Sequence, residues 1–296
     1  MKILNFGSLN IDYVYNVDHI VMPGETIGSY TMNVYPGGKG LNQTLAIARA
    51  GADVYHAGMV GQDGRMLTDL LQNDHVHCDF IRTVSHRTGS AFIQVDKNGQ
   101  NSIVLNGGAN NQNTLTFIES VLNCFDEGDW VLLQNEINLV DEIIQRAYDK
   151  KMRIAFNPSP INDALLDYAL DKISLFIMNE HEGEQITGEK ETDTILAAMH
   201  ERYPKSRVVL TLGKSGAVYR DNDNIYKHEA FSVEAVDTTA AGDTFTGYFL
   251  AAMTRNEDVP SALHIASKAA ALAVTKKGAA SSIPYLKEVI DVNLPG

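Results

Sequence analysis

The sequence predicts an α/β protein with a mostly parallel sheet that is covered by helices on both faces. Short apolar segments alternate with amphipathic segments of helical spacing along most of the 296 residues, a pattern typical of parallel strands joined by helices. Two other stretches alternate polar and apolar residues around turn sequences, as half-buried hairpin strands do. We therefore expect a small antiparallel sheet outside the main one.

The elements of the main sheet follow one another along the chain with few interruptions. Helix 39–50 (KGLNQTLAIARA) is amphipathic and is expected to end at Gly51, because glycine tolerates the backbone that closes a helix. Further helices are expected at residues 63–73 and 138–150. The expected strands are residues 2–8, 53–60, 130–134, 153–157, 174–178 and 207–212.

The small sheet is expected to act as a lid over a ligand site. Its strands come from about residues 12–36, with a turn at 23–26, and from about 88–106, with a turn at 97–99. A sheet that covers a site commonly pairs through its other face with a second subunit, so we expect a homodimer. Since no linker or repeat divides the chain, residues 1–296 are expected to form one domain.

The composition limits the classes of partner. With 37 acidic and 24 basic residues, the net charge of −13 argues against nucleic acids and anionic membranes as partners. Only Cys78 and Cys124 are present, so a reducing cytoplasm is the expected compartment. No segment has the apolar length of a membrane span. An anion such as ATP would need a local site of backbone dipoles, one or two cations and metal.

The stretch VDTTAAGDTFTGYF, residues 236–249, places small residues where a loop becomes a helix. Ala240, Ala241 and Gly242 would let an anion approach the unpaired N–H groups of the first turn. Asp243 follows directly, and a carboxylate beside an anion can accept the proton of an attacking hydroxyl. The alternative is an ordinary helix start with Asp243 complementing the helix dipole.

A second stretch, YPGGKGLNQTLAIARAG, is rich in glycine. Gly38 and Gly40 allow close backbone approach, while Lys39 and Asn42 offer a cation and an amide to a polyhydroxylated ligand. The alternative is a glycine-rich turn with a solvated lysine. The chain contains neither the phosphate loop G-x-x-x-x-G-K-[ST] nor the dinucleotide fingerprint G-x-G-x-x-G.

Polar side chains also follow several expected strands. Asn10 and Asp12 come after the first strand and Glu136 after strand 130–134, where ligands of α/β sheets bind. They are candidates for gripping sugar hydroxyls, with an Asx turn as the alternative for the first pair. Asn179 and Glu182 are three apart at a helix start, suited either to capping or to ordering Mg²⁺ hydration and phosphates.

Taken in order, these motifs resemble the ribokinase-like, or PfkB, family of carbohydrate and nucleoside kinases. The resemblance runs from Ile3 to about Leu286 and is most specific in D-T-x-A-A-G-D-T-F and G-G-K-G-x-N. It implies a Rossmann-like three-layer α/β/α domain with a β-sheet lid. It also implies ATP-dependent phosphorylation of a sugar hydroxymethyl group, here the O5 hydroxyl of ribose, by a dimer.

The resemblance also implies roles for individual residues. Asp243 looks like the base, and the N–H groups of Ala240, Ala241, Gly242 and Asp243 look like the anion hole. The positions similar to sugar contacts are Asn10, Asp12, Gly38, Lys39, Gly40, Asn42, Glu136 and Asp243. Those similar to ATP contacts are Asn179, Thr211, Gly213, Gly216, Gly242 and Ser267, and Glu182 resembles a glutamate that holds Mg²⁺ through water.

A site for K⁺ is a further implication of the resemblance. The matching positions are Asp237, Thr239, Ala273, Lys276, Gly278 and Ser282. An alanine-rich helix that ends near Gly278 would leave carbonyl oxygens free for a large cation.

Two other functions remain open from the sequence. One is another kinase of the family, acting on deoxyribose, fructose or a nucleoside; the polar lid residues Gln94, Ser102 and Asn106 leave the exact acceptor undecided. The other is a catalytically silent sugar-binding protein on the same fold, against which the retained Asp243 argues.

Overall fold

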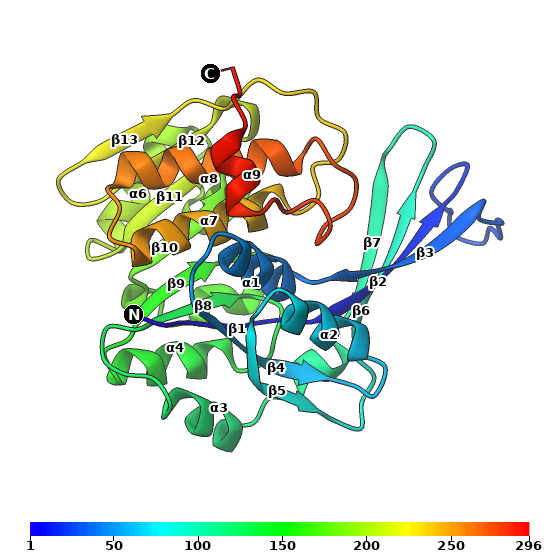
Figure 1. The fold of residues 1–296 in the computed structure, drawn as a ribbon, viewed down its shortest axis with the longest axis horizontal. Coiled ribbons are helices and arrows are strands. Elements are labelled where there is room, and N and C mark those ends of the chain that lie inside the picture. The colour runs from blue at the N-terminus through cyan, green and yellow to red at the C-terminus, as the bar shows by residue number, and fades with distance from the viewer. Residues whose placement is uncertain (296) are drawn as a thin grey trace.

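A computed structural model describes residues 1–295 of the chain. Within these residues, a nine-stranded sheet has the order β13-β12-β11-β10-β9-β8-β1-β4-β5 (Figure 1). Neighbouring strands from β5 to β11 pair in parallel, and β12 and β13 extend one edge in antiparallel fashion. The strands are β1 (Ile3–Phe6), β4 (Val54–Val60), β5 (His77–Thr83), β8 (Trp130–Gln134), β9 (Arg153–Asn157), β10 (Leu175–Asn179), β11 (Arg207–Thr211), β12 (Ala217–Arg220) and β13 (Ile225–His228). The sequence reading had not predicted β5, β12 or β13.

Helices cover both faces of this sheet, as expected. One face carries α1 (Lys39–Arg49), α2 (Arg65–Asn73), α7 (Ala241–Thr254), α8 (Val259–Ala273) and α9 (Leu286–Asp291). The other carries α3 (Leu115–Leu122), α4 (Val140–Asp149), α5 (Glu180–Thr187) and α6 (Thr192–Arg202). In β1, Ile3 faces the first layer and Leu4 and Phe6 the second, so both faces of the strand are buried. The three-layer α/β/α class is confirmed.

Short 3₁₀ turns complete the main body. They are η1 (Gly108–Asn111), η2 (Asp163–Asp167), η3 (Leu170–Lys172) and η4 (Gly213–Ser215). Among the described residues, none of the helices combines the length and apolarity needed to cross a bilayer.

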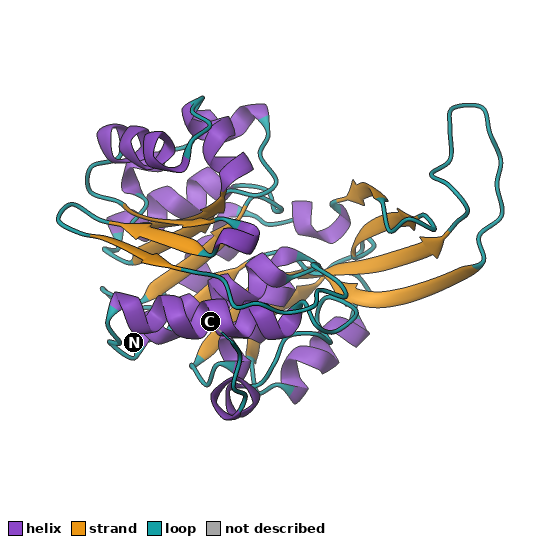
Figure 2. Cartoon of the chain, turned by 90° about the horizontal axis from the view of Figure 1, so that it is seen from above, coloured by secondary structure: helices purple, strands orange, loops and turns teal. Residues whose placement is uncertain are grey.

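The lid is a separate four-stranded sheet that projects from the main body (Figures 1 and 2). Its order is β3-β2-β6-β7, with bounds β2 (Asn10–Asn16), β3 (Thr31–Gly37), β6 (Gly89–Val95) and β7 (Asn101–Asn106). The outer pairs are antiparallel, as predicted, but the central pair β2–β6 is parallel. The expectation of an entirely antiparallel lid was therefore wrong. β2 and β6 both begin beside the main sheet and run outward, so they point the same way.

Two other boundaries differ from the sequence reading. The strand expected from residue 27 begins at Thr31, because the turn near residues 22–25 lies within a longer loop, residues 17–30. The alanine-rich helix expected to end near Gly278 ends at Ala273, and turns occupy the residues that follow.

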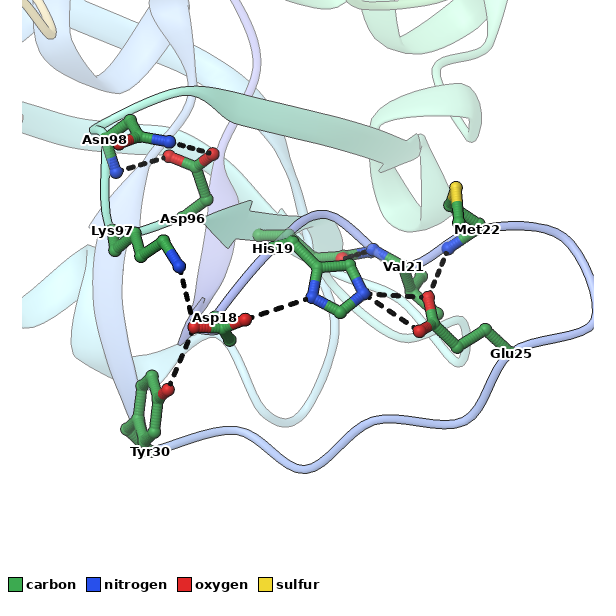
Figure 3. A network of polar contacts seen from close by, with 10 residues as sticks. Asp18, His19, Val21, Met22, Glu25, Tyr30, Asp96, Lys97 and Asn98 are labelled. Carbon is green, nitrogen blue, oxygen red and sulfur yellow. Dashed lines mark hydrogen bonds and ion pairs between the residues drawn. The ribbon is translucent and has the colours of Figure 1, made fainter.

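A polar network at the tip of the lid ties that long loop to the β6–β7 turn (Figure 3). His19 contacts the carboxylates of Asp18 and Glu25 through its two ring nitrogens, at 3.3 and 2.9 Å. Lys97 of the turn donates to Asp18 at 3.2 Å, and the Val21 N–H donates to Gln94 of β6. Gln94, one of the polar lid residues that left the acceptor undecided, thus supports the loop.

Candidate active site

The N-terminus of α7 presents unpaired donors to open space. Ala240, the residue before the helix, has a left-handed backbone with φ of 60°. Of the N–H groups predicted to form the anion hole, that of Ala241 donates instead to the Thr238 carbonyl at 3.3 Å, while those of Gly242 and Asp243 make no hydrogen bond within residues 1–295. No neighbouring atom lies within 4 Å of a Cβ placed on Gly242. This terminus therefore has the features of an anion-binding site.

The Asp243 carboxylate is buried and is held by two side chains of α1. Its Oδ2 accepts a hydrogen bond from Asn42 Nδ2 at 3.0 Å, and its Oδ1 accepts one from Gln43 Nε2 at 2.9 Å. α1 and α7 can pack this closely because Gly247 lies against Ala46, where a Cβ would come within 2.4 Å. The Asn42 oxygen is buried and has no partner among the described residues. It is thus available to a ligand hydroxyl.

A polar cavity of about 210 Å³ lies at this helix terminus. Its lining includes Lys39, Asn179, Glu182, Thr211 and Asp243, together with residues 240–242. Burial disfavours the charged form of Lys39, but the carboxylates of Asp243, Glu136 and Glu182 outweigh that effect and raise its pKa. A lysine that stays charged beside unpaired backbone donors suits the binding of phosphate.

Glu136 follows β8 and sits between the first strand and α1. Its Oε2 accepts hydrogen bonds from the Ser8 hydroxyl and, at 3.0 Å, from the Lys39 N–H. Burial raises its pKa and the charge of Asp243 adds to this, while Lys39 and the hydrogen bond from Ser8 oppose it. The other carboxylate oxygen has no protein donor within residues 1–295.

Asp12 of β2 lies close enough to Glu136 for their charges to interact. Burial, and then the negative charge of Glu136, raise its pKa to about 7. The carboxylate occupies the space beside Gly37 of β3, where a Cβ would be 2.0 Å from Asp12 Oδ2. Gly37 is therefore required for Asp12 to adopt this position.

The glycines of the G-G-K-G motif differ in what they do. Gly38 precedes α1 with φ of 95°, a backbone that glycine adopts without strain. At Gly40, a Cβ would come within 2.3 Å of the Ser8 nitrogen, and the Gly40 N–H donates to the Ser8 hydroxyl. Gly40 thus serves the close packing of α1 against the end of β1.

Asn10 is held by a neighbour that the sequence reading missed. Asn110 of η1 donates to Asn10 Oδ1 at 2.7 Å and accepts from the Leu9 N–H at 3.0 Å. Asn10 and Glu136 line a second polar cavity of about 210 Å³, which Asn106 also lines. The Asn10 amide group is thereby fixed with its oxygen turned toward Asn110.

A larger cavity of about 490 Å³ adjoins the first at the α7 terminus. Five of the six predicted ATP contacts line it: Thr211, Gly213, Gly216, Gly242 and Ser267. The sixth, Asn179, lines the polar cavity instead. Its apolar walls were not predicted from the sequence; they include Phe231, Val233, Ala235, Phe245 and Ala270. The Ser267 hydroxyl is buried without a partner among the described residues.

Glu182 and Asn179 form a capping box at the start of α5. The Asn179 side chain accepts from the Glu182 N–H at 2.8 Å, and Glu182 Oε2 accepts from the Asn179 N–H at 2.9 Å. One Glu182 oxygen remains for a ligand. Within residues 1–295 no cluster of three His, Cys, Asp or Glu could hold a metal. The remaining oxygen of Glu182 is of the chemical type that contacts the hydration shell of a Mg²⁺ ion.

The predicted K⁺ residues lie on two loops that Asp237 joins. Its carboxylate accepts from the Thr239 N–H and hydroxyl and from the Gly278 N–H, at 2.6–2.9 Å. Burial opposes ionisation, but these hydrogen bonds prevail and lower the Asp237 pKa. No lysine or arginine of residues 1–295 forms an ion pair with Asp237, although the charge of Lys277 also contributes to its lowered pKa.

The remaining predicted K⁺ residues occupy the turn after α8. The Ala273 carbonyl accepts from the Lys276 N–H at 3.1 Å, and the Ser282 hydroxyl donates to the Ala279 carbonyl at 2.9 Å. Lys276 turns its ammonium away, toward Glu288.

Fold and site together define a class of protein: a kinase in which a carboxylate and an anion-binding helix terminus meet beneath a lid. Residues 1–286 match the family described as pfkB family carbohydrate kinase. The chain therefore belongs to the pfkB family of carbohydrate kinases, which transfer phosphate from ATP.

Relatives within this family are similar over nearly their whole length. The ribokinase of Haemophilus influenzae is 36% identical over 295 residues, covering 96% of each chain. The structure of ribokinase from Cryptococcus neoformans in complex with ADP has a TM-score of 0.87 at 31% identity, covering 98% of this chain and 99% of that one. The Arabidopsis thaliana ribokinase complexed with ribose and ATP has a TM-score of 0.87 at 29% identity, covering 97% of each.

Proposed function

We propose that this protein transfers the γ-phosphoryl group of ATP to the O5 hydroxyl of D-ribose, giving ribose 5-phosphate and ADP. The observation that carries the proposal is the placement of Asp243 in the first turn of α7, directly beside the unpaired N–H groups. Its support comes from ribokinase relatives and from the ribose and ATP named for the Arabidopsis thaliana enzyme.

Asp243 is the base in this proposal. It accepts the O5 proton as O5 attacks the γ-phosphorus, and the bond from that phosphorus to the oxygen bridging the β- and γ-phosphates breaks, releasing ADP. The N–H groups of Gly242 and Asp243 and the Lys39 ammonium stabilise the negative charge on the phosphoryl group in flight.

The sugar is held by the polar groups on the other side of Asp243. Asp12 and Glu136 accept hydrogen bonds from its hydroxyls, and the free Asn42 oxygen accepts a third. Asn10, fixed by Asn110, has its amide NH₂ left to donate. The lid strand that carries Asp12 then covers the sugar and excludes water, which would otherwise compete for the phosphoryl group.

The nucleotide lies in the larger cavity, with its phosphates toward the polar one. Phe231 and Phe245 provide apolar surface for the base, and Ser267 provides a hydroxyl. Mg²⁺, when bound, neutralises phosphate charge. The contribution of Glu182 is to accept hydrogen bonds from the water around that ion.

We also propose that K⁺ binds beside Asp237 and raises the rate. The carboxylate already ties the loop before α7 to the turn after α8. A cation there would hold this loop, and thus the N–H groups at the α7 terminus, without touching either substrate.

One face of the lid carries a row of exposed apolar side chains. The register of the lid places Val34, Tyr13, Phe92 and Val104 in one row across all four strands, on the face opposite to Asp12. Val34, Phe92 and Val104 are 42–63% exposed. We propose that this row packs against a second lid in a homodimer.

We also propose that the protein is located in the cytoplasm, since Cys78 and Cys124 are both free thiols.

A panel of acceptors tests the function. ADP release is measured with ATP and ribose, deoxyribose, fructose, fructose 6-phosphate or adenosine, and the product is identified by ³¹P NMR. We expect ribose to give the highest kcat/KM and a product phosphorylated on C5. A higher kcat/KM with any other acceptor would overturn ribose as the substrate.

A further inference from the structure

Asp243 stands at the end of a chain of buried amides that the reaction itself does not use. Gln43 Nε2 donates to Asp243, Gln134 Nε2 donates to Gln43 Oε1 at 2.6 Å and to Asn5 Oδ1 at 3.0 Å. Asn5 Nδ2 donates to the Gly40 carbonyl at 2.8 Å. Asn5, Gln43 and Gln134 are completely buried, so each side chain depends on its neighbours for hydrogen bonds.

Separate anchors force this chain into one orientation. The Gly40 carbonyl can only accept, so Asn5 must turn its NH₂ there and its oxygen toward Gln134. Asn157 turns its NH₂ to the Ile177 carbonyl at 2.8 Å, leaving its own oxygen to accept from Gln43. An ionised Asp243 can only accept as well. Each anchor requires the Gln43 NH₂ to face Asp243.

The two oxygens of Asp243 therefore differ. Oδ1 faces a donor that cannot reverse, because turning the Gln43 amide would break its bonds to Gln134, Asn157 and Asp243 together. Oδ2 faces Asn42, whose own oxygen has no protein partner within residues 1–295. Once Oδ2 carries a proton, the Asn42 amide can turn its oxygen toward Oδ2 and its NH₂ toward the sugar hydroxyl, which can accept as well as donate.

We infer that Gln43 is a positioning residue that reserves Oδ1 as an acceptor and assigns proton uptake to Oδ2. This inference rests on the proposed function. Gln43 does not touch the sugar or the nucleotide; it fixes the rotation of the carboxylate so that the remaining lone pair of Oδ2 faces the O5 hydroxyl. The proton passes from O5 to Oδ2 and no other group is needed.

The test is the pH dependence of kcat at saturating ribose and ATP for Gln43→Met and Gln43→Glu. Methionine keeps the length and removes the donor, so the ionised Asp243 is less stabilised. We expect the acid limb of the kcat profile to move to higher pH by about one unit. Gln43→Glu keeps the shape but places a second carboxyl group against Asp243, and should move the limb further in the same direction.

Other charges near Asp243 are the same in all variants, so they do not account for a difference. The ammonium of Lys39 and the carboxylate of Glu136 interact directly with the charge of Asp243. Glu182 interacts in turn with Lys39, and Asp12 with Glu136. The KM for ATP should not change, since the nucleotide cavity does not include Gln43.

Ser206→Ala is the control. Its buried hydroxyl donates to the Ile173 carbonyl at 2.7 Å, away from the site, so this variant loses a buried hydrogen bond and should keep the wild-type acid limb. An unmoved acid limb in both Gln43 variants overturns the inference, as does an equal shift in Ser206→Ala. If Gln43→Met does not fold, the isosteric Gln43→Glu decides alone. A wild-type protein without kinase activity would contradict the proposed function instead.

Discussion

Asp12 is a site residue whose charge changes near neutral pH. Its pKa of about 7 lies above the usual value of 3.8, so the carboxyl group is neutral below pH 7 and ionised above it. An ionised carboxylate accepts hydrogen bonds from hydroxyls more strongly than a neutral one. We therefore predict that ribose affinity, measured by calorimetry, increases as the pH rises through about 7.

Asp12→Asn supplies the comparison, because the amide keeps the shape and does not titrate. Ribose should bind more weakly to this variant, without the pH step, while ATP affinity is unaffected. The same step in Asp12→Asn would assign the titration to another group. The effect of pH on stability is opposite to its effect on ribose affinity. Because the pKa of Asp12 is raised in the folded state, its ionisation lowers the free energy of unfolding as the pH rises from about 4 to about 7.

At this scale the sequence was informative where neighbours in the chain are neighbours in the site. Asp243 and its small-residue approach come from one stretch, so their placement at a helix start could be predicted. Asn42 was also identified, but not its bond to Asp243. Gln43 and Asn110 were missed, because their partners come from separate strands and turns that only the fold brings together.

At the scale of elements, a buried ion pair joins α1 to α2 and to the C-terminal turn. Arg49 donates to both oxygens of Asp74 at 2.9 and 3.0 Å and to the carbonyls of Ala280 and Ile283. Arg49→Ala would remove the charged partner of the buried Asp74 carboxylate and the donor to both carbonyls. We predict a decrease of about 3–5 kcal/mol in the free energy of unfolding, measured by urea denaturation.

The matched control is Arg65→Ala in α2, which removes an exposed ion pair with Asp69. It should cost at most about 1 kcal/mol. Equal losses in the two variants would show that the buried pair contributes no more than a surface pair.

The loop before α7 is the element through which K⁺ should act. We predict that kcat, in buffers of equal ionic strength, is higher with K⁺ than with Na⁺ or Tris, and that Asp237→Ala removes the difference. The reason is that Asp237 is the carboxylate joining the two cation-site loops.

Asp221→Ala is the comparison for this experiment. Asp221 also holds a turn by accepting backbone N–H groups, those of Asp223 and Asn224, but the turn belongs to β12–β13. A K⁺ response lost in both variants, or equal rates in all three buffers, would contradict a site at Asp237.

The sequence predicted the elements better than their pairing. Strand β8 was recognisable because both of its faces are buried and every residue from Trp130 to Leu133 is apolar. The lid strands were recognisable by alternation, but alternation does not reveal whether β2 and β6 run in the same direction. That depends on where each strand leaves the main sheet. β12 and β13 were missed because each has only four residues, and because β13, at the edge of the sheet, is partly exposed.

At the scale of the whole molecule, the proposed homodimer places the exposed apolar row of the lid at its interface. We predict that Phe92→Asp and Val104→Asp convert a dimer into a monomer, measured by light scattering after size exclusion. A charge in the middle of the cross-strand row would be buried without a partner in the dimer and solvated in the monomer.

Ile225→Asp on β13 is the control, since Ile225 is 54% exposed and lies on the main sheet. It should remain dimeric. A wild-type monomer, or dimers that tolerate both lid charges, would contradict the interface.

The net charge of −13 gives the molecule a field that does not attract ATP. Binding must therefore come from the local donors at the α7 terminus and from Lys39. The central claim therefore concerns one group: we propose that the carboxylate among those donors is a base, because as a mere negative charge it would repel the phosphates.

Asp243→Asn tests that claim most directly, by kcat at saturating ribose and ATP together with ATP affinity from calorimetry. The amide preserves the shape and can still contact Asn42 or Gln43, but it does not accept the O5 proton. We predict that kcat falls by about 10²–10⁴-fold while the protein folds and binds ATP at least as tightly as the wild type. A kcat near that of the wild type would contradict the assignment of Asp243 as the base.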